Sequence, residues 1–464
     1  MSERAFVFEV GVRRAGRWTV EGMRDRQDDA IANARDILAR GGCEAVRVVR
    51  GRIVDGHFLT GNAVFEAARP ERGEDAARVG DLDEAGAWCD AAADLYGARS
   101  RRAIGQLLRQ FLDRLGITPT ELLHNIRFAR KLEDEGMLMG AALHRAARAR
   151  ADETGAAHGE CVRALEGLLA TAWKRATEAR ADRRHPVPGH DGLDALAERA
   201  RHRAEDEAGR AFVARHGIAR VLEGEPTLLA RLAMVLGWAG AASAPESVAR
   251  VDELVADCLA SPEVLREVLG GQQDFATALM ATIDMARGRE PPPPPRPAPW
   301  YPDLARFLAT QLAPETRGVL MARVRRELAG PRPLARGDAT AEAAALTRVA
   351  EALRDDARGA YAGGGGTVVA MVRRWQRLDR PGGFGDLVLP QGGPAARFRA
   401  LALAETEIRG EMRRRAVATL LLDALRETPA ASRAALREFE PSIRRANLLD
   451  EARELVLREL SAAG

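Results

Sequence analysis

Histidine is the residue type whose placement first suggests chemistry, because the neutral imidazole is the commonest metal ligand among side chains. All eight histidines fall between His57 and His216, and seven of them follow residue 123. Glu121 and His124 form a single Glu-x-x-His pair, whereas a di-iron bundle needs two such pairs and two further glutamates. No His-Glu-x-x-His sequence occurs. Spacing alone therefore indicates no established metal motif.

One dipeptide, His190-Asp191, stands in a part of the chain that is otherwise helical. It resembles the core of the HD-domain phosphohydrolases, in which histidines and aspartates from several helices hold a divalent metal. The resemblance covers two residues, which follow a Pro-Val-Pro-Gly loop. It implies a metal-dependent phosphohydrolase in which His190 and Asp191 bind the metal, with His144, His158 and Asp194 as candidate partners.

Residues 104–125 form a helix, a Gly-Ile break and a short capped helix. This order is similar to the first two helices of helix-turn-helix DNA-binding domains, and it would imply a nucleic-acid-binding regulator using residues 104–135. The segment that should become the recognition helix ends in Glu133, Asp134 and Glu135, which phosphates would repel. A simple helical hairpin is the competing interpretation.

Other catalytic motifs are missing from the sequence. The glycine runs at residues 363–366 and 382–385 are not followed by Lys-Ser or Lys-Thr, and no Gly-x-Ser-x-Gly elbow occurs. The four cysteines are widely separated, which argues against a disulfide framework or a cysteine-based zinc site. We therefore expect no cofactor.

Composition limits the partners. The 46% hydrophobic content is enough for substantial cores, and the net charge of +3 gives no field that would steer the chain to nucleic acid. Lys131 and Lys174 are the only lysines, so 70 − 2 = 68 basic residues are arginines, spread evenly among acids. The longest apolar stretch, residues 232–245, is shorter than the roughly 20 residues of a membrane helix. We expect a cytoplasmic protein without membrane or nucleic-acid partners.

The first 68 residues predict a small α/β domain. Two alternating segments around residues 15–16 read as a hairpin, residues 28–40 as one helix, and residues 44–66 as two further strands. The order is ββαββ. Such a domain is marginal alone, so its free sheet face should be solvated or covered by a partner.

After a charged connector at residues 69–81, the pattern is helical in two blocks, residues 82–289 and 303–464. Residues 100–115 place apolar side chains on one face and arginines, including Arg101, on the other, and residues 247–260 repeat this design. Capping boxes are predicted at residues 118–121 and 243–246, and a long helix at residues 339–360.

The two blocks are joined by a proline-rich segment, residues 290–302, which predicts a stiff polyproline linker. Trp300 and Tyr301 close this segment in a chain that has few aromatics. We predict that these two residues are an interaction site that docks the second block onto the first.

The sequence thus predicts a mostly α protein, a multi-helix array in two blocks with a small N-terminal ββαββ domain. The favoured function is a cytoplasmic, non-enzymatic adaptor or regulatory protein that acts through protein–protein contacts, with self-association open. A metal-dependent HD-like phosphohydrolase and a nucleic-acid-binding regulator are the alternatives.

Overall fold

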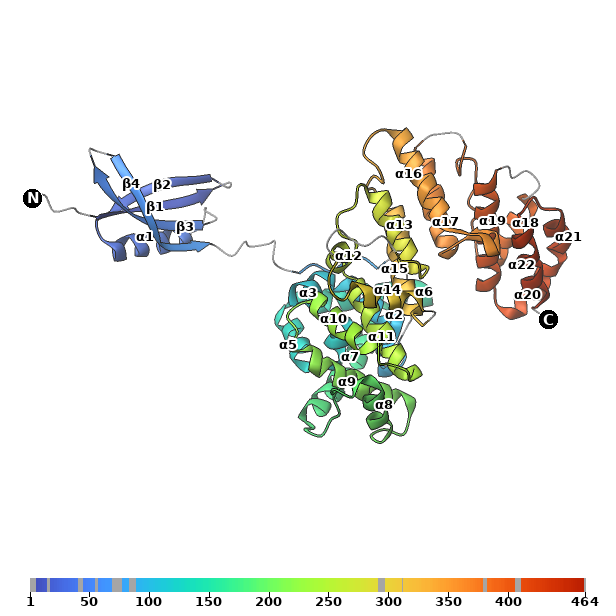
Figure 1. Ribbon diagram of the computed structural model, residues 1–464, viewed down its shortest axis with the longest axis horizontal. Helices are drawn as coiled ribbons and strands as arrows, with labels where there is room; N and C mark the ends of the chain where they lie inside the picture. The colour runs from blue at the N-terminus through green and yellow to red at the C-terminus, as the bar shows by residue number, and fades with distance from the viewer. Residues whose placement is uncertain are drawn as a thin grey trace, which may run out of the picture. The chain divides into compact units, whose positions relative to one another are not determined.

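The computed structural model describes residues 6–14, 17–40, 45–54, 57–68, 77–82, 89–290, 297–310, 312–378, 382–404 and 410–462. They belong to two compact units, Met1–Ala77 and Arg78–Gly464 (Figure 1). The chain is mostly α-helical with a small N-terminal antiparallel sheet, which confirms the predicted fold class.

The first unit has the predicted ββαββ order. Its elements are β1 (Phe6–Arg14), β2 (Arg17–Arg24), α1 (Gln27–Arg40), β3 (Ala45–Val54) and β4 (His57–Ala68), and the strand order in the sheet is β2-β1-β3-β4. Helix α1 lies across one face of the sheet (Figure 1). Val10 pairs with Val48 and Val12 with Val46, and all four valines are fully buried beneath α1.

The opposite sheet face carries Trp18, Val20 and Met23, which pair with the alternate residues of β1. Val20 is 57% exposed and Met23 is 41% exposed. The guanidinium of Arg47 lies 4.4 Å from the centre of the Trp18 ring, a cation–π distance. This face is therefore partly apolar and uncovered within its own unit.

The second unit is a helical array. The elements of its first part are η1 (Ala92–Tyr96), α2 (Ala98–Leu107), α3 (Arg109–Leu115), α4 (Pro119–His124), α5 (Ile126–Asp134), α6 (Met137–Thr154), α7 (His158–Ala181), α8 (Gly192–Arg201), α9 (Glu207–Leu222), α10 (Leu228–Ala239), α11 (Pro245–Leu259), α12 (Pro262–Leu269) and α13 (Phe275–Ala286). None of the helices in the described part of the chain is long and apolar enough to cross a membrane.

The chain continues beyond the proline-rich segment with further helices. These elements are α14 (Tyr301–Ala309), α15 (Pro314–Ala329), α16 (Ala339–Ala352), β5 (Arg354–Asp355), η2 (Asp356–Arg358), β6 (Ala360–Tyr361), α17 (Gly364–Gln376), α18 (Pro394–Ala404), α19 (Glu411–Glu427), α20 (Ala430–Leu436), η4 (Arg437–Phe439), α21 (Glu440–Arg445) and α22 (Asp450–Ser461).

Two large cores hold this unit together, and α13 and α15 contribute to both. Leu279 and Ile283 of α13 pack with Val324 and Leu328 of α15 in the core that α16 to α22 complete. The next faces of the same helices join the core of α8 to α14. Helices on both sides of the proline-rich segment therefore share buried surface, while residues 291–296 of the predicted linker lie outside the described residues.

Local differences from the sequence predictions have physical causes. The predicted helix at residues 339–360 ends at Ala352, where a short β5–β6 hairpin begins. Thr118 and Glu121 form the predicted capping box of α4, but the box predicted at Ser243 is wrong. The Ser243 hydroxyl and backbone N–H donate instead to Asp194. Residues 69–76 of the predicted connector lie outside the described residues.

Candidate functional site

The residues proposed as metal ligands lie in two separate places. His144 of α6 and His158 of α7 are exposed, and their ring nitrogens Nδ1 and Nε2 are 3.1 Å apart. His190 is exposed, and the Asp191 carboxylate is bonded by the Arg199 guanidinium 2.5 Å away.

Asp194, the further candidate ligand, accepts hydrogen bonds from the Ser243 hydroxyl and from the backbone N–H groups of Ser243 and Ala244. The hydroxyls of Ser243 and Ser247, with these backbone groups, lower the pKa of its carboxyl to about 2. Among the described residues, no group of three or more His, Cys, Asp or Glu side chains is placed to hold a metal ion. The structure therefore brings His144 and His158 together, and it does not add the His190-Asp191 dipeptide to them.

Three further histidines, His124, His185 and His216, are buried around α4 and α9. His216 Nδ1 lies 2.8 Å from the His124 backbone oxygen, and the His185 and His216 ring centres are 4.4 Å apart. Burial lowers the pKa of all three histidines, that of His216 to about 4. These rings are neutral parts of the core at neutral pH.

The short helix of the helix-turn-helix resemblance, α4, is buried along its whole length. Its Glu121 carboxylate is 0% exposed and bonds the Arg231 guanidinium at 2.8 Å. A helix packed in this way presents no side chain to a nucleic acid. The described geometry favours the hairpin interpretation of residues 104–135.

A cavity of about 300 Å³ lies between α8, α9 and α11. We call it the α8–α9–α11 cavity. Its lining combines apolar side chains with guanidinium and carboxylate groups: Leu193, Leu196, Ala197, Ala200, Arg201, Glu207, Arg210, Ala211, Ala214, Ile218, Glu246, Ser247 and Arg250.

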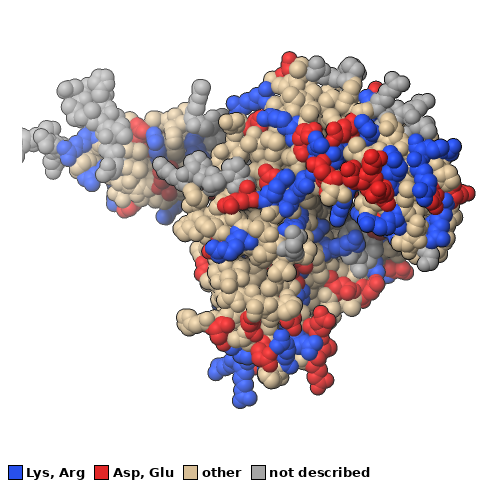
Figure 2. Space-filling view, turned by 45° about the vertical axis from the view of Figure 1, so that its right-hand side comes forward, with Lys and Arg blue, Asp and Glu red and all other residues tan. Residues whose placement is uncertain are grey.

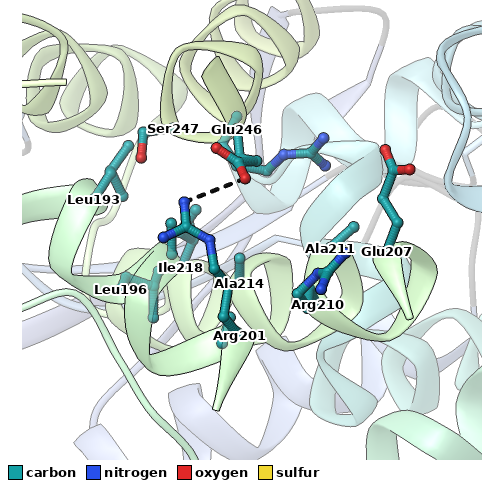
Figure 3. A pocket seen from close by; sticks show the side chains of 13 residues that line it. Leu193, Leu196, Arg201, Glu207, Arg210, Ala211, Ala214, Ile218, Glu246 and Ser247 are labelled. Carbon is teal, nitrogen blue, oxygen red and sulfur yellow. Dashed lines mark hydrogen bonds and ion pairs between the residues drawn. The ribbon is translucent and has the colours of Figure 1, made fainter. Parts of the chain in front are cut away.

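The charged and apolar groups of this cavity are segregated. In the view of Figure 3, Leu193 and Leu196 lie on one side and Glu207 and Arg210 on the other, with the bond between Arg201 and Glu246 between them. The Arg201 Nη2 to Glu246 Oε1 distance is 3.3 Å. The cavity is therefore lined by an apolar wall on one side and a charged wall on the other.

Behind the cavity lies a buried ion-pair network centred on Glu253 of α11. Arg215 donates to both Glu253 oxygens at 3.0 and 2.6 Å, and Arg250 donates at 2.7 Å. Arg101 of α2 lies 3.7 Å from Glu253 and 3.3 Å from Asp257. Nearby Arg215 and Arg250 overcome the opposing effect of burial and lower the pKa of Glu253.

The same network reaches α15 across the core. Asp252, next to Glu253, accepts hydrogen bonds from the backbone N–H groups of Glu315 and Thr316 at 2.8 and 2.9 Å. Those are donors at the first turn of α15, so Asp252 acts as the cap of a helix that lies beyond the proline-rich segment. The network thus links α2, α9, α11 and α15.

Sequence reasoning missed this network, and the expectation that Arg101 lies on a solvent face is wrong, because the residue is 1% exposed. The helical period places Glu253 opposite the apolar stripe of α11, yet Glu253 is only 4% exposed. Both faces of α11 are covered, one by apolar side chains and the other by arginines. No local pattern distinguishes such a helix from a surface helix.

A second hollow, a groove of about 720 Å³, runs along α12, α13 and α15 and the loop of residues 330–337. We call it the α12–α13 groove. Its lining includes Leu265, Leu269, Phe275, Leu279, Arg266, Arg323, Arg332, Arg336, Asp274 and Glu327. The Arg332 guanidinium lies 4.3 Å from the centre of the Phe275 ring. Arginines thus flank an apolar floor.

Two acids of the α12–α13 groove are already engaged within the fold. Asp274 caps α13 by accepting from the Thr277 N–H at 2.7 Å, and it pairs with Arg348 at 2.9 Å. Glu327 pairs with Arg323 at 2.6 Å. The positive charge of Arg266, Arg332 and Arg336 is therefore not matched by these two carboxylates. Over the face drawn in Figure 2, basic and acidic side chains interleave.

The predicted interaction residues Trp300 and Tyr301 stand at the start of α14. Tyr301 is 5% exposed, and Trp300 is half-buried against the core formed by α8 to α14. Helix α14 lies against α10, which precedes the proline-rich segment. That Trp300 and Tyr301 are an interaction site stays a prediction. Comparison of the chain with protein-family models, with curated proteins and with solved structures gives no match.

Proposed function

We propose that this chain is a non-enzymatic adaptor or regulatory protein, and that its helical unit holds segments of protein partners in the α12–α13 groove. The observation that carries the proposal is the combination of an apolar floor and flanking arginines in one open groove. Buried apolar contact supplies affinity in such a groove, and charge complementarity supplies orientation and rate of association.

The chemistry of the groove defines the partner. Leu265, Leu269 and Phe275 favour large apolar side chains, while Arg266 and Arg336, both exposed, favour carboxylates. An amphipathic segment rich in Asp or Glu and in apolar residues satisfies both. The uncovered face of the N-terminal sheet, with Val20 and Met23 exposed, is a second contact surface in this proposal.

A selection experiment tests the groove. Random peptides displayed on phage would be selected on the full chain and, in parallel, on a variant with Arg266→Glu and Arg336→Glu. We expect acidic, apolar-rich peptides from the native chain and loss of their binding by the variant, with steep salt dependence. Arg163→Glu on the exposed surface of α7 is the matched control.

Two outcomes would contradict the proposal. Selected peptides without acidic enrichment would show that the arginines do not recognise the partner. Peptides that bind the groove variant as tightly as the native chain would place the contact surface elsewhere.

A further inference from the structure

The α8–α9–α11 cavity contains charged groups that the fold leaves uncommitted. Arg210 donates to the Glu205 backbone oxygen at 3.1 Å, and among the described residues it forms no ion pair. Glu207 opens α9 and likewise has no ion-pair partner within the described part of the chain. The cavity thus holds one guanidinium and one carboxylate that are available to a ligand, one turn apart on the same helix.

A second guanidinium, that of Arg250, belongs to the same lining and is largely buried, with 15% of its side chain exposed. One of its nitrogens bonds Glu253, and the fork of a guanidinium has further donors. Burial and the neighbouring Arg215 and Arg101 lower the pKa of Arg250 to about 10. An incoming carboxylate would relieve this unfavourable environment.

The remaining wall of the cavity is apolar. Leu193, Leu196, Ala214 and Ile218 come from α8 and α9 and belong to the adjoining core. A cavity of about 300 Å³ is at the small end of the range for small-molecule sites, so it suits a compact ligand. Its lining shares no residue with that of the α12–α13 groove.

We propose that the α8–α9–α11 cavity binds a free α-amino acid with an apolar side chain. Its carboxylate is held by Arg210 and Arg250, its ammonium group by Glu207, and its side chain lies against Leu193 and Leu196. A purely anionic ligand would leave Glu207 unmatched in the cavity, and a purely cationic one would leave the two arginines unmatched. A zwitterion with an apolar body matches the two arginines, Glu207 and the apolar wall.

The binding test uses the full chain and ligands that differ by one group. Isothermal titration calorimetry with leucine, valine, methionine and phenylalanine is compared with isocaproate, which lacks the amine of leucine, and isoamylamine, which lacks its carboxylate. We expect at least one of the four amino acids to bind. Since each deleted group leaves a partner unpaired, isocaproate and isoamylamine should bind at least about tenfold more weakly than leucine if leucine binds.

Variants separate the roles of the two walls. Arg210→Gln should weaken amino-acid binding by about tenfold or more. Glu207→Gln should reduce the affinity for leucine to that for isocaproate, and Ala211→Phe, which fills the cavity without changing charge, should abolish binding. Arg163→Gln on α7 is the control and should bind as the native chain does.

Three results would overturn the inference. One is that none of the four amino acids binds. Another is that binding survives both Arg210→Gln and Ala211→Phe in folded protein, verified by an unchanged thermal unfolding midpoint. The third is that isocaproate binds as tightly as leucine, which would remove the role assigned to Glu207.

Discussion

Glu253→Gln is the substitution with the largest effect expected from this structure. The Glu253 side chain is 5% exposed and is the only ion-pair partner of Arg215 in the described part of the chain. It also bonds Arg250 and lies 3.7 Å from Arg101. Glutamine keeps the size of the side chain but removes its charge, so the change tests electrostatics rather than packing.

The magnitude follows from what is left unpaired. Arg101 keeps Asp257 at 3.3 Å, but the buried Arg215 guanidinium loses its carboxylate. Removing one partner of a buried ion pair costs about 3 to 5 kcal/mol. The matched control is Glu246→Gln on the same helix. The Glu246 side chain is 58% exposed and pairs with Arg201 at the surface, so the control should cost at most about 1 kcal/mol.

Urea unfolding followed by tryptophan fluorescence measures both variants, since Trp173 and Trp375 are largely buried in the helical unit. The sign of the pH dependence gives a second readout. The pKa of Glu253 is lowered in the folded state, so its contribution is present above the unfolded value of 4.5 and is lost as the pH falls. Glu253→Gln should flatten this acid limb. A loss below about 1 kcal/mol, equal to that of Glu246→Gln, would refute the reasoning.

Further predictions concern the buried histidines and two helical glycines. The pKa of His216 is about 6.5 in the unfolded chain and about 4 in the folded one. Its contribution to the free energy of unfolding should therefore be fully present above pH 6.5 and should fall as the pH drops below that value. The loss in the free energy of unfolding due to His216 is about 2 kcal/mol between pH 6.5 and 5. The variant His216→Gln should lack this loss. A urea midpoint of the native chain that does not change across this pH range would contradict the effect of burial on the His216 pKa. A Cβ on Gly217 would lie 2.3 Å from the Pro186 oxygen, so Gly217→Ala should destabilise by about 1 to 3 kcal/mol. Gly140→Ala in α6, where a Cβ would meet open space, should be neutral or stabilise the fold by up to about 1 kcal/mol. Equal shifts of the thermal unfolding midpoint in Gly217→Ala and Gly140→Ala would contradict the predicted clash with the Pro186 oxygen.

The parts of the fold that the sequence predicted are those with a local signal. The alternating strands of the N-terminal domain and its single amphipathic helix follow from a period of two and a period near 3.6. The capping box at Thr118 is likewise a local device. Cys89, Cys161 and Cys258 are buried, and none of these three is in a disulfide.

The parts that could not be predicted depend on packing between distant segments. Arg101 and Glu253 occupy positions that a helical wheel assigns to solvent, and they are buried because other helices cover those faces with opposite charges. The cavity residues Glu207 and Glu246 are separated by 39 positions and meet only through the packing of α8, α9 and α11. Histidine spacing predicted one site for His144, His158 and His190, but the structure brings only His144 and His158 together.

The central claim is that the α12–α13 groove binds acidic, apolar protein segments. Hydrogen exchange of the full chain, measured with and without the strongest peptide selected on it, tests this claim most directly. We predict added protection in α12, α13 and residues 330–337, which line the groove, and none in the same segments when Arg266 and Arg336 are replaced by glutamate. Protection confined to other helices, or unchanged exchange in the groove with the peptide bound, would contradict the claim.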